Sequence, residues 1–321
     1  MIRDRCRGRL SDRPARHRLK SVPYTILACA LATASPVEAG LSEGSRLRAV
    51  YDLILDARFE QAAAQLTATC PPAPEGACKA IGAVSLQWQI LIDPQNRSLD
   101  QALKQAAAGA VAANAAWTGR EPMRAEAWFY LAGAYAPLVQ LRVLRGERLA
   151  AARDGKKIKD ALERALQLDP ALYDAYFGIG LYHYYADVAP MYAKVLRWLL
   201  LLPGGDRMKG LQEIITARER GELLRGEADF QLHQLYVWYE QRPHDALTLL
   251  KSLDARYPAN PIFLERIAEV YDTYLHDTVA SAEAWRTLRQ RARDGRVAFA
   301  RLIESRADRK LRELAARRAK N

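Results

Sequence analysis

The chain contains little cysteine and histidine, and this scarcity limits the chemistry that its side chains can support. Its 321 residues include four cysteines and five histidines. The histidines are scattered, and the sequence contains no H-E-x-x-H, no G-x-S-x-G and no Cys–His pair beside an orienting acid. A zinc site, which needs four nitrogen or sulfur ligands, is not predicted either. We therefore expect a protein without a catalytic centre, a metal or a cofactor.

Long apolar runs are also missing. The N-terminal segment VPYTILACALATA spans about 13 residues, whereas a membrane-spanning helix needs about 20. It follows an arginine-rich stretch and precedes Val37-Glu38-Ala39, whose small residues fit a signal-peptidase site. We expect residues 1–39 to be a cleaved export signal and the protein to reach the periplasm or cell envelope. Two alternatives stay open: lipid attachment through Cys29, or a tail that is not a signal on a cytoplasmic protein.

Positive charge is concentrated at the two ends of the chain. The formal net charge is +11, but residues 1–39 carry eight basic and three acidic side chains, and residues 286–321 carry thirteen and four. The part between them is therefore close to neutral. The basic isoelectric point does not describe the body of the protein, and no nucleic-acid partner is predicted for an exported chain.

Only two cysteines remain after the expected signal. Cys70 and Cys78 flank the proline-rich sequence PPAPEGA. In an oxidising compartment two such cysteines can close a short loop, so we predict a disulfide between them if the chain is exported. The alternative is a pair of small buried residues at helix ends.

Alternating Val, Ile and Thr of the kind that marks β-strands is missing, and helical patterning dominates from Ser45 onward. Apolar residues recur at three- and four-residue spacings, and the prolines lie between the segments. A period of 34 residues links Glu227–Pro258 to the unit that begins at Pro261. Large, small and proline residues recur at matching positions of these and earlier units: Trp128, Leu131, Ala132, Tyr135, Ala165, Pro170, Gly180, Ala246, Pro258, Ala268 and Tyr271. This pattern resembles the tetratricopeptide repeat (TPR).

The resemblance implies an all-α fold: a right-handed helical solenoid over residues 40–294, with about five to six helix-turn-helix units and a basic C-terminal capping helix or tail over 295–321. Small residues let the helices of a unit approach closely, and proline ends the second helix. The unit from Trp128 to Pro170 is enlarged, and we expect residues 137–162 to form an extended second helix or an additional one.

The stretch LLLLPGGDRMKG, residues 199–210, can be interpreted in three ways. It lacks the lysine and hydroxyl of a phosphate-binding loop, and its apolar run is too short to cross a membrane. We therefore predict a helix over Ala193–Leu202, a Pro-Gly-Gly turn, and a second helix that Asp206 caps.

A tyrosine-rich segment precedes that stretch. Tyr176, His183, Tyr184, Tyr185 and Asp187 are candidate residues for a pocket that binds a peptide or a sugar-like ligand. The alternative is that these side chains fill the grooves between repeats. The order of this segment, the apolar helix and PGGDR resembles uncharacterised exported bacterial TPR proteins. More faintly, it is similar to a eukaryotic TPR family tied to inclusion-body and lipid-droplet clearance.

The C-terminal segment keeps a helical apolar spacing from Val297 to Leu314, with arginines on its other faces. It is expected to cover the last repeat, or else to contact anionic membrane headgroups or another acidic partner. Taken together, the sequence predicts a non-catalytic scaffold of the bacterial cell envelope that binds a partner protein or peptide in its concave groove. The competing hypothesis is a small-ligand or glycan-binding protein, or an enzyme of unrecognised type, built on the tyrosine-rich segment.

Overall fold

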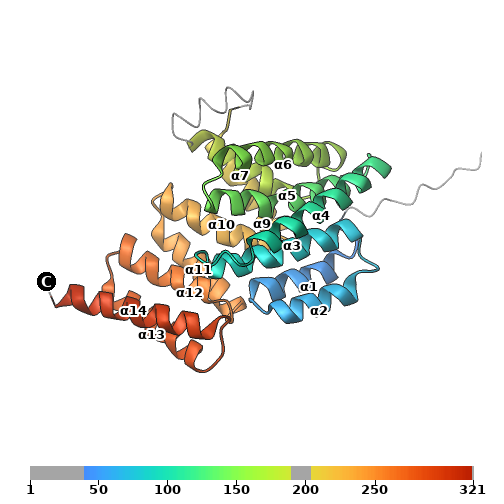
Figure 1. The fold of residues 1–321 in the computed structure, drawn as a ribbon. Coiled ribbons are helices and arrows are strands. Elements are labelled where there is room, and N and C mark those ends of the chain that lie inside the picture. Colours follow the sequence, from blue (N-terminus) through green and yellow to red (C-terminus); the bar gives the residue numbers. More distant parts are fainter. Residues whose placement is uncertain (1–39, 189–203, 320–321) are drawn as a thin grey trace, which may run out of the picture. The chain divides into compact units, whose positions relative to one another are not determined.

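The computed structural model describes residues 40–188 and 204–319, and within these ranges every regular element is a helix. Helices pair in chain order (Figure 1). The pairs are α1 (Gly44–Leu55) with α2 (Phe59–Thr69), α3 (Glu75–Ile92) with α4 (Asp100–Arg120), α5 (Ala125–Leu144) with α6 (Arg148–Leu168), α7 (Ala175–Val188) with α9 (Arg207–Arg220), α10 (Arg225–Trp238) with α11 (Pro243–Arg256), and α12 (Pro261–Glu269) with α13 (Thr278–Arg293). The π-helical turn η1 (Val270–Tyr274) continues α12, and α14 (Ala300–Arg318) packs on α13. The predicted all-α helical-repeat fold with a final helix is confirmed.

Small residues at the predicted positions allow paired helices to touch. A Cβ atom on Gly180 would lie 2.7 Å from the carbonyl oxygen of Gly210, and one on Gly210 would lie 2.5 Å from that of Gly180. Both distances are too short for a real contact, so α7 and α9 cross where neither backbone carries a side chain. Ala132, Ala165 and Ala246 are buried in the same way.

The start of α9 follows the prediction. The side chain of Asp206 accepts a hydrogen bond from the backbone N–H of Lys209 at 2.9 Å, which satisfies one of the free donors of the first turn. The helix predicted over Ala193–Leu202 lies outside the described residues. No helix in the described ranges is both long and apolar enough to span a bilayer.

Two expectations about helix boundaries were wrong. Pro137 lies inside α5, not between segments. Residues 137–144 therefore extend the first helix of the enlarged unit, while the second helix begins at Arg148. At the C-terminus, the helical spacing expected from Val297 does not correspond to a helix before Ala300. Phe299 takes a left-handed conformation with φ 56°, so α14 begins at Ala300.

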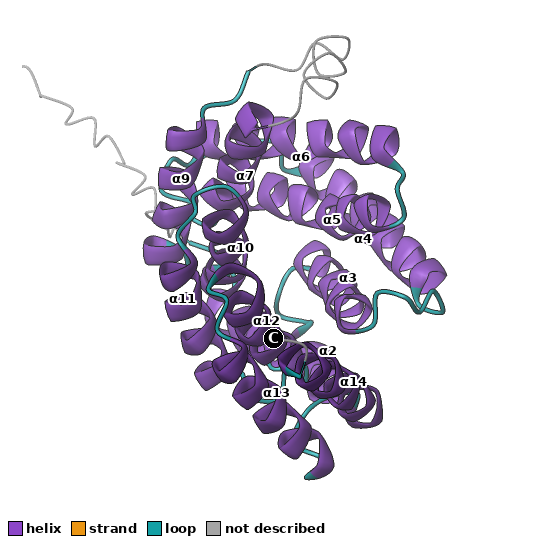
Figure 2. Cartoon of the chain, turned by 90° about the vertical axis from the view of Figure 1, so that its left-hand side faces the viewer, coloured by secondary structure: helices purple, strands orange, loops and turns teal. Residues whose placement is uncertain are grey.

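The first three helices, α1 to α3, contact parts of the chain far from them in sequence, and we call them the N-terminal cover. The ring of Trp88 in α3 packs on Phe230 of α10 and Phe263 of α12, with centroid distances of 5.1 and 6.1 Å. Figure 2 shows α3 with α5 on one side and α12 on the other. In a simple repeat array each unit touches only its neighbours. This chain instead joins the N-terminal cover to its fifth and sixth helix pairs and to its last helix.

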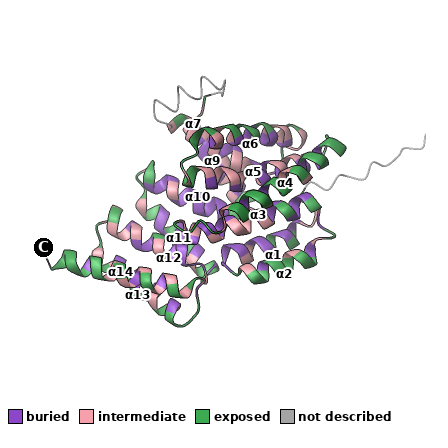
Figure 3. Cartoon of the chain, viewed as in Figure 1, coloured by how far each residue is buried: buried purple, intermediate pink, exposed green. Residues whose placement is uncertain are grey.

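The burial of α10 shows the effect of the N-terminal cover (Figure 3). Eleven of its fourteen residues are buried, although a surface helix buries one stripe only. Helices α9 and α11 cover two sides of α10, and contacts from Tyr51, Leu55 and Trp88 cover a third side. The sequence assigned a partner to the concave groove. At α10 the protein itself fills that space with its N-terminal cover.

Helix α14 covers the end of the array through apolar and ionic contacts. Its buried side chains are Ile303, Ala307 and Leu314. Arg306 pairs with Glu265 of α12 at 2.8 Å and also donates to the carbonyl oxygen of Ile92 at the end of α3 at 2.9 Å. Part of the basic charge of this helix is therefore used within the protein.

Candidate functional site

The tyrosine-rich helix α7 is held by contacts between helices. Tyr184 is fully buried, and its hydroxyl donates a hydrogen bond to Glu240 at 2.5 Å. Arg207 pairs with the same carboxylate at 2.7 Å and holds the pKa of Glu240 below its usual range. Burial raises the pKa of the Tyr184 hydroxyl well above its ordinary value. Tyr185 packs edge to face on Tyr184 and on Tyr239, so its ring also fills space between helices.

The other predicted residues of this segment also have partners within the protein. His183 Nδ1 lies 2.6 Å from Glu213 of α9. Asp187 is exposed and accepts the backbone N–H of Arg207 at 3.0 Å. The hydroxyl of Tyr176 donates to the carbonyl oxygen of Pro170 at 3.2 Å. These are the contacts that the groove-filling alternative predicts, and they tie α7 to α9 and to the loops beside it. A ligand pocket on this segment stays a prediction.

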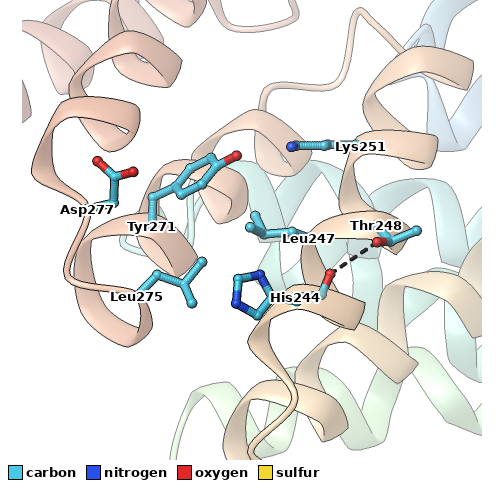
Figure 4. Close-up of a pocket in the computed structure, with 7 residues that line it drawn as sticks. All are labelled: His244, Leu247, Thr248, Lys251, Tyr271, Leu275 and Asp277. Carbon is cyan, nitrogen blue, oxygen red and sulfur yellow. Dashed lines mark hydrogen bonds between the residues drawn. The ribbon is translucent and has the colours of Figure 1, made fainter.

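A cavity of about 580 Å³ lies elsewhere, between α11 and the η1–α13 corner (Figure 4). We call it the α11–α13 cleft. Figure 4 shows the side chains of the two elements facing each other across it. Its lining residues are His244, Leu247, Thr248 and Lys251 from α11, and Tyr271, Leu275 and Asp277 from the other side. The volume falls within the range of small-molecule sites, although this cavity is open to solvent on one side.

The π-helical turn η1 forms one wall of the α11–α13 cleft. The backbone N–H of Leu275 donates to the carbonyl oxygen of Val270, five residues back, at 3.1 Å. A π turn admits one more residue than an α turn and so changes the direction of the side chains that follow, which is why such turns are frequent at functional sites. Here Tyr271 and Leu275 face α11.

The polar groups of the α11–α13 cleft include cationic and neutral donors as well as the carboxylate of Asp277. The ammonium group of Lys251 lies 5.5 Å from the centre of the Tyr271 ring, and within the described part of the chain neither Lys251 nor His244 forms an ion pair. One oxygen of the Asp277 carboxylate, Oδ1, caps α13 by accepting the N–H groups of Val279 and Ala280, and its Oδ2 is left as an acceptor among the described residues. Leu247 is buried beneath these polar groups. The cleft can therefore hold a side chain with an apolar stem and an acceptor at its tip.

The buried carboxylate of Glu227 lies at the junction of the N-terminal cover with α10. It accepts hydrogen bonds from the hydroxyl of Tyr51 and the indole N–H of Trp88, each at 3.2 Å. Burial raises the pKa of Glu227 to about 7, while the hydrogen bonds from Trp88, Tyr51 and Gln231 act in the opposite direction. No cation pairs with this carboxylate among the residues described. Its contacts join α1, α3 and α10, so its role is to hold these helices together.

The sulfur atoms of Cys70 and Cys78 lie at disulfide-bonding distance, with their Cα atoms 6.3 Å apart. A disulfide at this position closes the loop between α2 and α3, and hence lies within the N-terminal cover. In the described ranges no group of three His, Cys, Asp or Glu residues is arranged to hold a metal ion.

Sequence reasoning did not find the α11–α13 cleft. Tyr271 was predicted only as a repeat residue, and His244 is one of the five histidines described as scattered. Lys251, Thr248 and Leu275 had no signal, because the π turn that brings their elements together has no sequence pattern of its own.

The fold and these sites define an all-α helical-repeat protein whose N-terminal cover packs against α10 and α12. No protein-family model matches the chain, and no curated protein matches it. Among solved structures, it is similar to TTC0263, a thermophilic TPR protein of Thermus thermophilus. The two share 17% identity with a TM-score of 0.40, and the match covers 71% of this chain and 98% of that one.

Proposed function

We propose that the protein is a non-catalytic interaction scaffold of the bacterial cell envelope that holds a segment of a partner protein in the α11–α13 cleft. The observation that carries this proposal is the open cavity between two helix pairs, with an apolar floor at Leu247 and, among the described residues, donors without ionic partners at Lys251 and His244. Such a combination of apolar contact and a few oriented polar groups is typical of recognition sites. The lack of a recognisable catalytic pattern supports the non-catalytic assignment.

The sequence points to the concave groove as the place of the partner. At α10 and α12 the space is taken by Trp88 and the rest of the N-terminal cover, so a partner that contacts these helices there would have to displace α3. The α11–α13 cleft needs no such displacement. For this reason we assign the partner to the cleft.

Two features support the proposed location in the envelope. Residues 1–39 have the composition of an export signal. The disulfide between Cys70 and Cys78 is of a kind that persists in oxidising compartments. The exposed arginines of α14, among them Arg301, Arg309 and Arg312, also offer a surface for peripheral contact with anionic lipid.

The test uses a photo-crosslinking residue at Thr248, in the cleft, and the same residue at Thr216 of α9 as a matched control. Each threonine donates its hydroxyl, at the protein surface, to the carbonyl oxygen four residues before it. After irradiation of the cell envelope, a defined crosslinked protein is expected from position 248 and not from position 216. Its yield is expected to fall when Lys251→Glu is added.

Equal crosslinking from the two positions, or a yield that Lys251→Glu leaves unchanged, would contradict the cleft as the binding site. Circular dichroism of Lys251→Glu provides the folding control, since Lys251 is exposed and its replacement should leave the helix content unchanged.

A further inference from the structure

The first described residues, Gly40 to Gly44, are held by two carboxylates that come from distant parts of the chain. The backbone N–H of Ser42 donates to Glu126 at 2.7 Å, and its hydroxyl donates to the same side chain at 2.9 Å. The backbone N–H of Leu41 donates to Glu222 at 3.4 Å, and the side chain of Leu41 is buried. This segment is therefore fixed before α1 begins, and terminal segments stay ordered only when tied down in this way.

Two glycines let the Glu222 carboxylate approach the backbone. A Cβ atom on Gly44 would lie 2.5 Å from one carboxylate oxygen, and one on Gly40 would lie 3.3 Å from the other. A side chain at position 44 would displace the carboxylate, and one at position 40 would press on it. The backbone of Gly40 thus lies directly beside a negative charge.

Among the described residues around Gly40, no cationic side chain forms an ion pair with the carboxylate of Glu222. Arg124 pairs with Glu126 at 2.9 Å and also donates to the hydroxyl of Ser42 at 2.6 Å, and Glu43 is paired with Arg46 within the first turn. Behind Glu222, the buried carboxylate of Asp174 accepts the backbone N–H groups of residues 222 to 224 and adds a second negative charge. The field at Gly40 therefore favours a positive group.

We propose that Glu222 is the binding site for a free α-ammonium group at Gly40, which is created when a peptidase removes residues 1–39. Hydrolysis breaks the bond between the carbonyl carbon of Ala39 and the nitrogen of Gly40. Water supplies the hydroxyl to Ala39, which leaves as a carboxylate, and the protons go to the Gly40 nitrogen, which becomes an ammonium. An amide nitrogen has one donor and no charge, whereas the ammonium has three donors and a full positive charge, so cleavage supplies the cation that Glu222 lacks among the described residues.

This inference rests on removal of residues 1–39, which belongs to the proposed envelope location, and it is independent of the α11–α13 cleft. It predicts that the pKa of the α-amino group is raised, because a nearby carboxylate favours the charged form. The unperturbed value is about 7.7 to 8.0, and we expect a rise of about half to one unit.

The test begins with the full-length chain, expressed in a bacterium and purified from the envelope fraction. Intact-mass measurement is expected to show a chain that starts at Gly40. The apparent pKa of its α-amino group is then obtained from the pH dependence of acylation of the N-terminal peptide. Glu222→Gln keeps an acceptor for the N–H of Leu41 and removes the charge, so its α-amino pKa is expected to fall back to about the unperturbed value.

A second variant protects the test against a folding defect in Glu222→Gln. Insertion of Gly-Gln-Gln between Ala39 and Gly40 keeps glycine as the first residue after the cleavage point, creates no second small-residue cleavage sequence, and moves the ammonium about 10 Å along the chain. Its α-amino pKa should match that of Glu222→Gln. A mature chain that starts elsewhere, or an α-amino pKa that is the same in the wild type and both variants, would overturn the proposal.

Discussion

The indole N–H of Trp88 donates to the carboxylate of Glu227 at 3.2 Å, although 139 positions separate the two residues in the chain. Trp88 belongs to α3 and Glu227 to α10, so this one hydrogen bond joins the second helix pair to the fifth. Tyr51 adds a bond from α1 to the same carboxylate. A solenoid whose units touch only their neighbours can lose stability unit by unit, whereas long-range bonds of this kind couple distant units.

The raised pKa of Glu227 predicts a pH dependence of stability. Its folded pKa is about 7 against an ordinary value of 4.5, so between these values the native state binds the proton and the unfolded state releases it. Stability should therefore fall as pH rises from about 4.5 to 7, by on the order of 3 kcal/mol, and then level off. Glu227→Gln removes the titrating group and should remove this slope.

Urea denaturation of the wild type and of Glu227→Gln at pH 5 and pH 8 measures the effect. The variant should gain stability relative to the wild type as the pH is raised. A relative stability that is the same at both pH values would show that the carboxylate does not titrate in this range.

The close crossing of α7 and α9 predicts that one methyl group added at Gly210 lowers the free energy of unfolding markedly. Gly210→Ala would place a carbon 2.5 Å from a backbone oxygen, so the helices must separate, and we expect a loss of about 2 to 3 kcal/mol. Gly155 in α6 has no atom within 4 Å of the position that a Cβ would take, and Gly155→Ala should be neutral or stabilising by up to about 1 kcal/mol. Thermal unfolding of the two variants separates packing from helix propensity, and equal effects would argue against a close crossing.

The contacts of Arg306 predict that this residue anchors α14 to α12 and to the end of α3. It pairs with Glu265, whose pKa is raised by burial, and it also contacts the end of α3. Arg306→Ala leaves that carboxylate without its partner and should cost about 2 to 4 kcal/mol. Arg309, with a side chain 61% exposed, is the matched control, and Arg309→Ala should change the free energy of unfolding by less than about 0.5 kcal/mol. If the two variants lost a similar free energy of unfolding, Arg306 would contribute only through the net positive charge of α14.

The disulfide predicts a measurable dependence on reductant. Cys70 and Cys78 close a loop with a sequence separation of 8, for which chain entropy gives about 2.5 kcal/mol. The double variant Cys70→Ala/Cys78→Ala should therefore unfold at a lower urea concentration than the oxidised wild type. Wild type treated with dithiothreitol should approach the variant. A midpoint unaffected by reductant would show that the cysteines are not bonded in the purified protein.

The sequence was sufficient for the all-α helical-repeat fold and for some of its helix contacts, and the reason is local. The spacing of Gly180 and Ala246, and the capping residue Asp206, act on adjacent turns, so they can be recognised without knowing the rest of the chain. Pro137 was assigned to a helix boundary because proline interrupts a helix in isolation. Packing of α5 against α3, α4 and α6 stabilises the helix through it.

The N-terminal cover and the α11–α13 cleft could not be predicted, because both depend on residues that are distant or on an irregular turn. Trp88 and Glu227 each look like ordinary helix residues, and nothing in their own neighbourhood indicates the other. The wall of the cleft depends on η1, whose extra residue has no sequence pattern. The tyrosine-rich segment was conspicuous in composition, and its hydroxyls serve contacts such as Tyr184 with Glu240.

We expect the N-terminal cover and the pair α10–α11 to unfold together as one cooperative unit. Native-state hydrogen exchange of α10 amides in the wild type and in Trp88→Ala tests it most directly. Our account predicts that α10 and α3 exchange with the same opening free energy in the wild type, and that Trp88→Ala lowers both by a similar amount. A variant in which α3 loses protection while α10 keeps its wild-type value would contradict it.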